Sequence, residues 1–187
     1  GDLATSTDET GIVTTYSYSG LPGDLSSMVV DAGVGRLNLT SSFSYDSTGN
    51  RTGSTNARGF SKTMTFDNSR RVTSVTENGM GIATAFTYDV YGNVISTSKS
   101  NGPQPQTTSA TYSGIGDLTS TTDPMGFVTT HAYNALGQRI STTDPELRQR
   151  QFQYDSAGRL LVLIDANGVA EETRTYNAAG YLDSIKD

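Results

Sequence analysis

Cysteine and tryptophan are absent from this 187-residue chain, which has one histidine and five prolines. Without cysteine it can form no disulfide, no thiolate zinc site and no cysteine nucleophile. The longest apolar run, Leu160 to Ile164, is far too short to cross a bilayer as a helix, so membrane insertion is not expected. The first residues show neither a basic nor an apolar leader region, and we expect no signal peptide there.

Basic residues are also few, because 13 Lys and Arg stand against 19 Asp and Glu, for a formal net charge of −6. A nucleic-acid interface needs clustered Lys and Arg, and the densest cluster here is the pair Arg70 and Arg71. Nucleic acid is therefore not an expected partner. The hydrophobic fraction of 34% is low for a thick core. Ten Tyr, six Phe and abundant Val, Ile and Thr nevertheless favour β-strands over disorder.

The chain repeats an aromatic residue followed by a tetrad that resembles Asp/Asn-x-x-Gly. Successive aromatics are separated by 21 to 27 residues: Tyr18, Tyr45, Phe66, Tyr88, Tyr112, Tyr133, Tyr154 and Tyr176. A gap-free alignment supports the period independently, since residues 1–18 and 116–133 are identical at 10 of 18 positions. Such recurrence is typical of a repeat protein. We expect residues 1–187 to form a single array of about seven repeats of 21–22 residues.

Each period contains two turn signals, one directly after the aromatic and one about ten residues later. Asp or Asn at the first position and Gly at the fourth are typical of a type I turn that ends in a left-handed residue. We therefore assign a structural role to the repeat residues Tyr45, Asp46, Gly49, Tyr88, Asp89, Gly92, Asp123, Gly126, Tyr133, Asn134, Gly137, Tyr154, Asp155, Gly158, Asp165, Gly168, Tyr176, Asn177 and Gly180.

The segments between the turns have the length and alternation of strands. Two four-residue turns leave room for two strands of about six or seven residues per period, and the segment from Phe127 to Tyr133 alternates with period two. The predicted fold is all-β: a meander of antiparallel hairpins in one continuous curved or spiralling sheet. Each repeat tyrosine is expected to stack on its counterpart in the next hairpin.

Four segments depart from the regular pattern. The tetrad that ends at Arg70 lacks glycine, which predicts a looser or differently shaped turn, and the tetrad that ends at Leu147 lacks it too. Loops are expected near residues 19–44, where the period is stretched, and near residues 99–109, where two prolines occur.

The phased Tyr-Asp-x-x-Gly series resembles the YD repeats of RHS proteins, of shell components of bacterial Tc toxins and of teneurins. The resemblance extends over essentially the whole chain. It implies hairpins that coil into a β-sheet around a hollow interior, which holds a toxic C-terminal domain or, in teneurins, forms part of a cell-surface scaffold. The family's terminator, an Asp-Pro-x-Gly-Leu motif, is not found, because Asp123 to Phe127 falls in phase with the other repeat turns.

Other patterns offer weaker chemistry. His131 has no second histidine or cysteine to join it as a metal ligand, and the recurring acids are better explained as turn residues than as a glycosidase pair. Asp165 to Gly168 resembles part of a calcium loop but lacks the distal glutamate. Asn38 and Asn50 begin N-glycosylation triplets, which matter only in a eukaryote. No catalytic, cofactor-binding or metal-binding residue is assigned.

These observations predict a non-enzymatic structural segment of a larger, secreted or cell-surface RHS-type protein, part of a β-sheet shell around a toxin or effector cargo. Its partners would be the remaining repeats and the C-terminal cargo domain of the parent chain. The alternative is an adhesin-like module that binds carbohydrate or protein, because exposed tyrosines can stack on sugar rings. Unpaired edge strands would also permit self-association.

Overall fold

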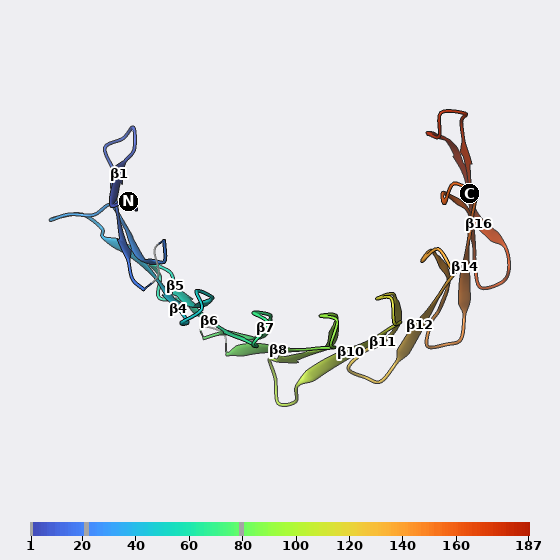
Figure 1. Ribbon diagram of the computed structural model, residues 1–187, viewed down its shortest axis with the longest axis horizontal. Helices are drawn as coiled ribbons and strands as arrows, with labels where there is room; N and C mark the ends of the chain where they lie inside the picture. The colour runs from blue at the N-terminus through green and yellow to red at the C-terminus, as the bar shows by residue number, and fades with distance from the viewer. Residues whose placement is uncertain (1, 21–22, 79–80) are drawn as a thin grey trace. The chain divides into compact units, whose positions relative to one another are not determined.

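The computed structural model describes residues 2–20, 23–78 and 81–187, and within these ranges it contains 17 strands and no helix. Figure 1 follows the strands along the chain from the blue N-terminus to the red C-terminus. The strand pairings are antiparallel and join strands that follow one another in the sequence. The predicted all-β meander is confirmed. No helix in the described ranges is long and apolar enough to cross a membrane.

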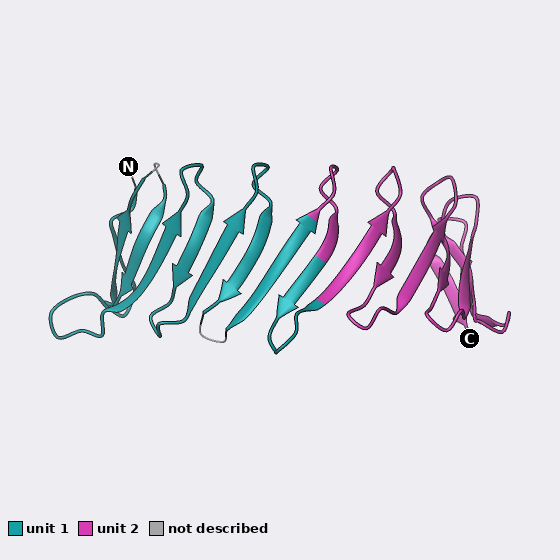
Figure 2. Ribbon diagram, turned by 90° about the horizontal axis from the view of Figure 1, so that it is seen from below, with its two compact units in different colours: residues 1–87, 97–106 teal, residues 88–96, 107–187 magenta. Residues whose placement is uncertain are grey.

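The strands fall into two compact units (Figure 2). Unit 1 comprises residues 1–87 and 97–106, and unit 2 comprises residues 88–96 and 107–187. The strands of unit 1 are β1 (Thr5–Thr7), β2 (Val13–Tyr18), β3 (Leu25–Val30), β4 (Leu39–Tyr45), β5 (Arg51–Thr55), β6 (Ser61–Phe66), β7 (Val72–Glu77) and β8 (Ile82–Tyr88). Their lengths are three to seven residues, and β1 and β5 are shorter than the six or seven expected from the turn spacing.

Unit 2 repeats the same plan. Its strands are β10 (Gln106–Tyr112), β11 (Leu118–Thr122), β12 (Val128–Tyr133), β13 (Arg139–Thr143), β14 (Gln149–Tyr154), β15 (Leu160–Ile164), β16 (Ala170–Tyr176) and β17 (Leu182–Lys186). Strand β9 (Val94–Ser100) is divided between the units at Ser96.

Each unit has two chemically different faces, which the strand register defines. Residues directly opposite one another in an antiparallel pair point to the same face, and the face with the repeat aromatics is here called the aromatic face. It carries Tyr16, Tyr18, Met28, Phe43, Tyr45, Met64 and Phe66 in unit 1 and Tyr112, His131, Tyr133, Phe152, Tyr154, Leu163 and Tyr176 in unit 2. The opposite, hydroxyl face is rich in Ser and Thr, as in the rows Ser27–Ser42–Thr55 and Ser120–Thr130–Thr143.

Neither face forms a closed hydrophobic core. Among the described residues no hydrophobic side chain is fully buried, which agrees with the low hydrophobic fraction of the sequence. Gly53 on the hydroxyl face is buried, and a Cβ at that position would lie 2.5 Å from the Ser44 hydroxyl. The fold therefore rests on strand ladders, half-buried side chains and turn contacts rather than on a dry interior.

The two predicted loop regions are shorter than expected. Within residues 19–44 the chain forms β3 and β4, because Leu25 to Val30 continues the strand pattern, so the extra length lies mainly in residues 31–38. Leu21 and Pro22 of the predicted loop lie outside the described residues. Within residues 99–109 only residues 101–105 lie between strands, and β10 already begins at Gln106.

Candidate functional site

The first turn of each repeat has one recurring geometry, which Asp155 illustrates. The Gly158 amide donates to the Asp155 carbonyl at 3.0 Å, and the Asp155 amide donates to the Arg159 carbonyl at 2.9 Å. Oδ1 of Asp155 accepts the backbone amides of Ala157 and Arg159, both at 2.9 Å. The side chain thus closes the turn as an Asx turn does.

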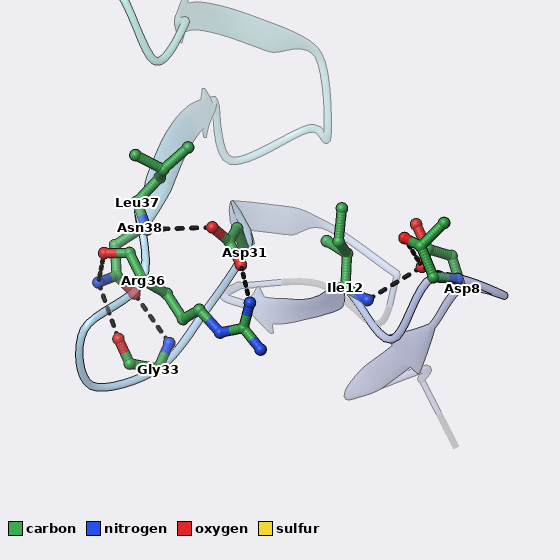
Figure 3. Close-up of polar contacts among 8 residues, drawn as sticks. Asp8, Ile12, Asp31, Gly33, Arg36, Leu37 and Asn38 are labelled. Carbon is green, nitrogen blue, oxygen red and sulfur yellow. Dashed lines mark hydrogen bonds and ion pairs between the residues drawn. The ribbon is translucent and has the colours of Figure 1, made fainter.

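The other predicted turn residues occupy the same positions. Side-chain Oδ1 accepts backbone amides two and four residues onward at 2.9 to 3.1 Å in each of Asp46, Asp89, Asp123, Asn134, Asp165 and Asn177. The closing glycines all have φ between 74° and 96°: Gly49, Gly92, Gly126, Gly137, Gly158, Gly168 and Gly180. The structure also gives Asp8 this arrangement, with Ile12 as its second donor (Figure 3).

The two tetrads without glycine keep the regular turn, so the predicted looser shape at residues 66–70 is wrong. Arg70 donates its amide to the Asp67 carbonyl at 3.0 Å with φ of 61°, and Leu147 donates to Asp144 at 3.0 Å with φ of 64°. The aspartate contacts hold the turn closed even though a side chain is strained in this left-handed conformation.

A residue that the sequence assignment omitted completes the turns at Asp46, Asp67, Asp89, Asp144 and Asp155. It stands four positions after the acid and donates from its side chain to Oδ2, as Arg159 Nε does to Asp155 and Asn50 Nδ2 does to Asp46, at 2.7 and 2.8 Å. Its signal in the sequence is the recurrence of Asn, Arg or Gln directly after the glycine position. In the turn at Asn134 the direction is reversed, because Asn134 Nδ2 donates to Gln138 Oε1 at 2.7 Å. The Nε2 of Gln138 donates instead to the Gly158 carbonyl of the next hairpin at 3.1 Å.

These contacts favour the ionised form of four of the turn carboxylates. The backbone amide and the side chain of Arg159 lower the pKa of Asp155, and the backbone amide of Val169 lowers that of Asp165. The side-chain amides of Asn50 and Asn93 lower the pKa of Asp46 and Asp89. Hydrogen bonds donated to a carboxylate favour its charged form. The acids are therefore saturated acceptors in the turns.

The repeat tyrosines tie each hairpin to its neighbour by a hydroxyl bond. The phenol donates to a backbone carbonyl on the adjoining strand at 2.8 to 3.2 Å, in the pairs Tyr18–Leu3, Tyr45–Leu25, Tyr112–Val94, Tyr133–Leu118, Tyr154–Arg139 and Tyr176–Leu160. The acceptor is usually the residue paired with the preceding repeat aromatic, as Leu160 is paired with Tyr154. This contact is called the tyrosine tie below.

The tyrosine tie replaces the predicted stacking of one tyrosine on the next. Tyr133 ends β12 and Tyr154 ends β14, and β13 runs between them. Two strand spacings separate their backbones by about 9–10 Å, which exceeds the usual centroid distance of stacked rings. The rings contact arginines instead, as Arg159 lies 4.4 Å from the centroid of Tyr176.

His131 and Asp165 have structural surroundings. Nδ1 of His131 lies 3.1 Å from the Thr142 hydroxyl, and burial, with a smaller contribution from Arg139, lowers the pKa of this histidine. No group of three or more His, Asp or Glu able to hold a metal occurs in residues 2–20, 23–78 and 81–187. Both oxygens of Asp165 accept hydrogen bonds, Oδ1 from the Asn167 and Val169 amides and Oδ2 from the Asn167 side chain.

The long turn of residues 31–38 has its own network, shown in Figure 3. Asp31 accepts the Leu37 amide at 3.1 Å and pairs with Arg36 at 3.5 Å. Asn38, which begins one of the N-glycosylation triplets, donates its amide to the Gly33 and Arg36 carbonyls. Its side-chain nitrogen is thus part of the turn.

Among the hollows of the described residues, one lies on the aromatic face of each unit. In unit 1 a hollow of about 340 Å³ lies between Phe43 and Phe60, beside Arg51 and Lys62. In unit 2 a hollow of about 530 Å³ lies beside Phe152, where Arg139 stacks on the ring at 4.9 Å. The charges around the second hollow are paired internally, Arg148 with Asp144 and Arg150 with Glu171.

Comparisons with known proteins agree with this geometry. The RHS Repeat family matches residues 112–149, which contain four successive turns of unit 2. The comparison with curated proteins gave no match.

Solved structures share the fold over nearly the whole chain. A crystal structure of TcdB2-TccC3-Cdc42 is similar over 97% of this chain with a TM-score of 0.66 and 17% identity. A crystal structure of TcdB2-TccC3 gives 0.65 and 18%, and the Photorhabdus luminescens Tc holotoxin pore gives 0.62 and 16%, each again over 97% of this chain. The chain spans 12% of the length of each of those proteins. Residues 112–149 thus match an RHS repeat, and the solved Tc-toxin structures share the fold of the chain around this segment.

Proposed function

We propose that the chain is a non-enzymatic wall segment of a larger RHS-type protein, secreted or at the cell surface, and that this wall encloses a toxin or effector cargo. The observation that carries the proposal is the tyrosine tie, which links neighbouring hairpins by the same bond in repeat after repeat. Such a bond joins identical units along a line and can continue beyond any one repeat.

The chemistry of the faces supports this role. The turn acids are saturated by backbone donors, and the hydroxyl face offers small polar side chains with no clustered charge. Both faces are accessible, as a wall wetted on both sides requires. The partners would be the remaining repeats on either side and the C-terminal cargo domain of the parent chain.

The test begins with the parent reading frame on both sides of the chain. In-phase Tyr-Asp repeats followed by a distinct C-terminal domain are expected. In the full parent protein that domain should resist a protease that digests it rapidly when it is expressed alone. Gly158→Val, which strains one turn, should make the domain accessible, whereas Val90→Thr at an exposed turn tip should not. A C-terminal domain cut equally fast in both contexts would contradict the proposal.

The alternative, an adhesin-like module that binds carbohydrate or protein, is favoured by one specific feature. The hollow between Phe43 and Phe60 presents aromatic, cationic and hydroxyl groups together. A binding activity there is compatible with a structural role for the array.

A further inference from the structure

The hollow of unit 1 has a simple origin in the strand register. Phe43, Ser54, Lys62 and Glu77 lie directly opposite one another on β4, β5, β6 and β7, and so form one row across the aromatic face. Ser54 is the small member between two large ones. In unit 2 the repeat that contains Phe152 has a larger side chain, Leu163, directly opposite the ring. In unit 1 the small Ser54 lines the hollow directly opposite Phe43.

The charges around this hollow favour an anion. Arg51 stacks on Phe43 with its guanidinium 5.7 Å from the ring centroid, and Lys62 lies opposite Ser54 on the neighbouring strand β6. The single carboxylate, Glu77, is 4.0 Å from Lys62, a distance at the limit of an ion pair, and both side chains are more than 40% exposed. Two cations thus face one weakly engaged carboxylate in a chain whose net charge is −6. Stacking holds the guanidinium in a fixed plane, which suits a bidentate contact with a carboxylate.

The apolar and hydroxyl groups specify the rest of the ligand. Phe60 is 56% exposed and presents a ring to the hollow. Ser54 and its neighbouring hydroxyls supply groups that both donate and accept hydrogen bonds. At about 340 Å³ the space is within the range of ligand sites. We propose that the hollow binds a uronic acid unit of an acidic oligosaccharide, with its carboxylate on Arg51 and Lys62 and its ring against Phe60.

This proposal is independent of the structural role of the array, and its failure would leave that role untouched. The ligand class combines three features that the hollow matches together: a ring with an apolar face, several hydroxyls and one carboxylate. A neutral sugar would leave the two cations without a partner, and a plain aromatic acid would leave the hydroxyls without one.

The experiment is an NMR titration of the full 187-residue chain with α-1,4-linked digalacturonate, the neutral digalactoside of the same linkage, and phenylpropionate. Digalacturonate should give saturable shifts centred on the amides of Arg51, Phe60 and Lys62, and the other two compounds should bind at least about 10-fold more weakly. Affinity should fall as salt increases, because the contact is partly ionic.

Two variants and one control test the assignment to the hollow. Ser54→Leu introduces the side chain that stands opposite Phe152 in unit 2, so it should abolish binding while the chain stays folded. Arg51→Gln should weaken binding about 10-fold or more, the loss expected for a charge-assisted pair. Arg139→Gln, at the same repeat position in unit 2, should change nothing. Equal binding of the neutral digalactoside, or unchanged affinity in Ser54→Leu or Arg51→Gln, would overturn the proposal.

Discussion

The hydroxyl of Tyr154 donates a hydrogen bond of 2.8 Å to the carbonyl oxygen of Arg139 and so joins two hairpins that are otherwise separate at this end of the strands. Tyr154→Phe should lower the free energy of unfolding by about 1 kcal/mol, the net worth of one such bond. Chemical denaturation measures the difference.

Phe66 gives the reciprocal test. It occupies the repeat position of the tyrosines but has no hydroxyl, and the acceptor that the pattern predicts is the carbonyl of Arg51, which is paired with Tyr45. Phe66→Tyr should add a tie and raise the free energy of unfolding by up to about 1 kcal/mol. No gain in Phe66→Tyr together with no loss in Tyr154→Phe would show that the tie contributes nothing.

Replacement of Leu147 by glycine should stabilise the folded chain. Leu147 has a φ of 64° and an 83% exposed side chain, so Leu147→Gly relieves strain at little loss of contact and should stabilise by about 1 kcal/mol.

Gly158→Val should cost about 2 kcal/mol, because φ is 84° and a Cβ there would lie 3.0 Å from Gln138 Nε2. Hydrogen exchange should show the damage confined to the neighbouring hairpins, and a normal protection pattern in Gly158→Val would refute the turn assignment.

The lowered pKa of Asp155 predicts that the stability of the chain depends on pH. Hydrogen bonds from the Arg159 amide and guanidinium lower the pKa of Asp155 below that of an unfolded aspartate, about 3.9. The stabilisation is therefore present above about pH 4 and is lost as the pH falls through the folded pKa. Asp155→Asn keeps the backbone contacts, as Asn134 and Asn177 do naturally, but does not titrate. The difference in Tm between the native chain and this variant should shrink as the pH falls from 5 to 2, and a difference that is independent of pH would contradict the prediction.

His131 reports on the aromatic face of unit 2. Burial and the nearby Arg139 lower the pKa of His131, so protonation of the ring destabilises the folded state. The stability associated with the neutral ring is complete above the ordinary value near 6.5 and is lost as the pH falls through the folded pKa. Arg139→Gln should raise the pKa of His131 partway towards 6.5, because the larger effect, burial, remains. As the single histidine, His131 gives isolated ring signals in an NMR titration. An unchanged pKa would remove Arg139 as a cause.

The turns and the fold class could be predicted from the sequence because their causes are local. An acid and a glycine three residues apart determine a turn, and strands follow from the spaces between turns. The geometry at Arg70 and Leu147 could not be predicted in this way, because hydrogen bonds to Asp67 and Asp144 outweigh an unfavourable backbone angle.

The tyrosine ties and the hollow depend on the register between paired strands, which cannot be read from any one segment of the sequence. The acceptor of Tyr154 is identified only when the pairing of β13 with the neighbouring strands is known. In the same way, Ser54 looks like any other serine of a Ser/Thr-rich strand until it is found opposite Phe43. The sequence also left the residue after each glycine unassigned, because its role needs the direction of a side chain.

The lack of a shared interior has a consequence for how this molecule comes apart. Its contacts join residues close in sequence or in adjoining hairpins, so loss of one hairpin removes support only from the two beside it. Such a chain unzips stepwise from weak points instead of melting all at once, and its calorimetric enthalpy should exceed the van't Hoff value. Folding should be fast for the same reason, because pairing between strands close in sequence needs little loop closure. Mutations can therefore accumulate in one hairpin while distant hairpins keep their structure.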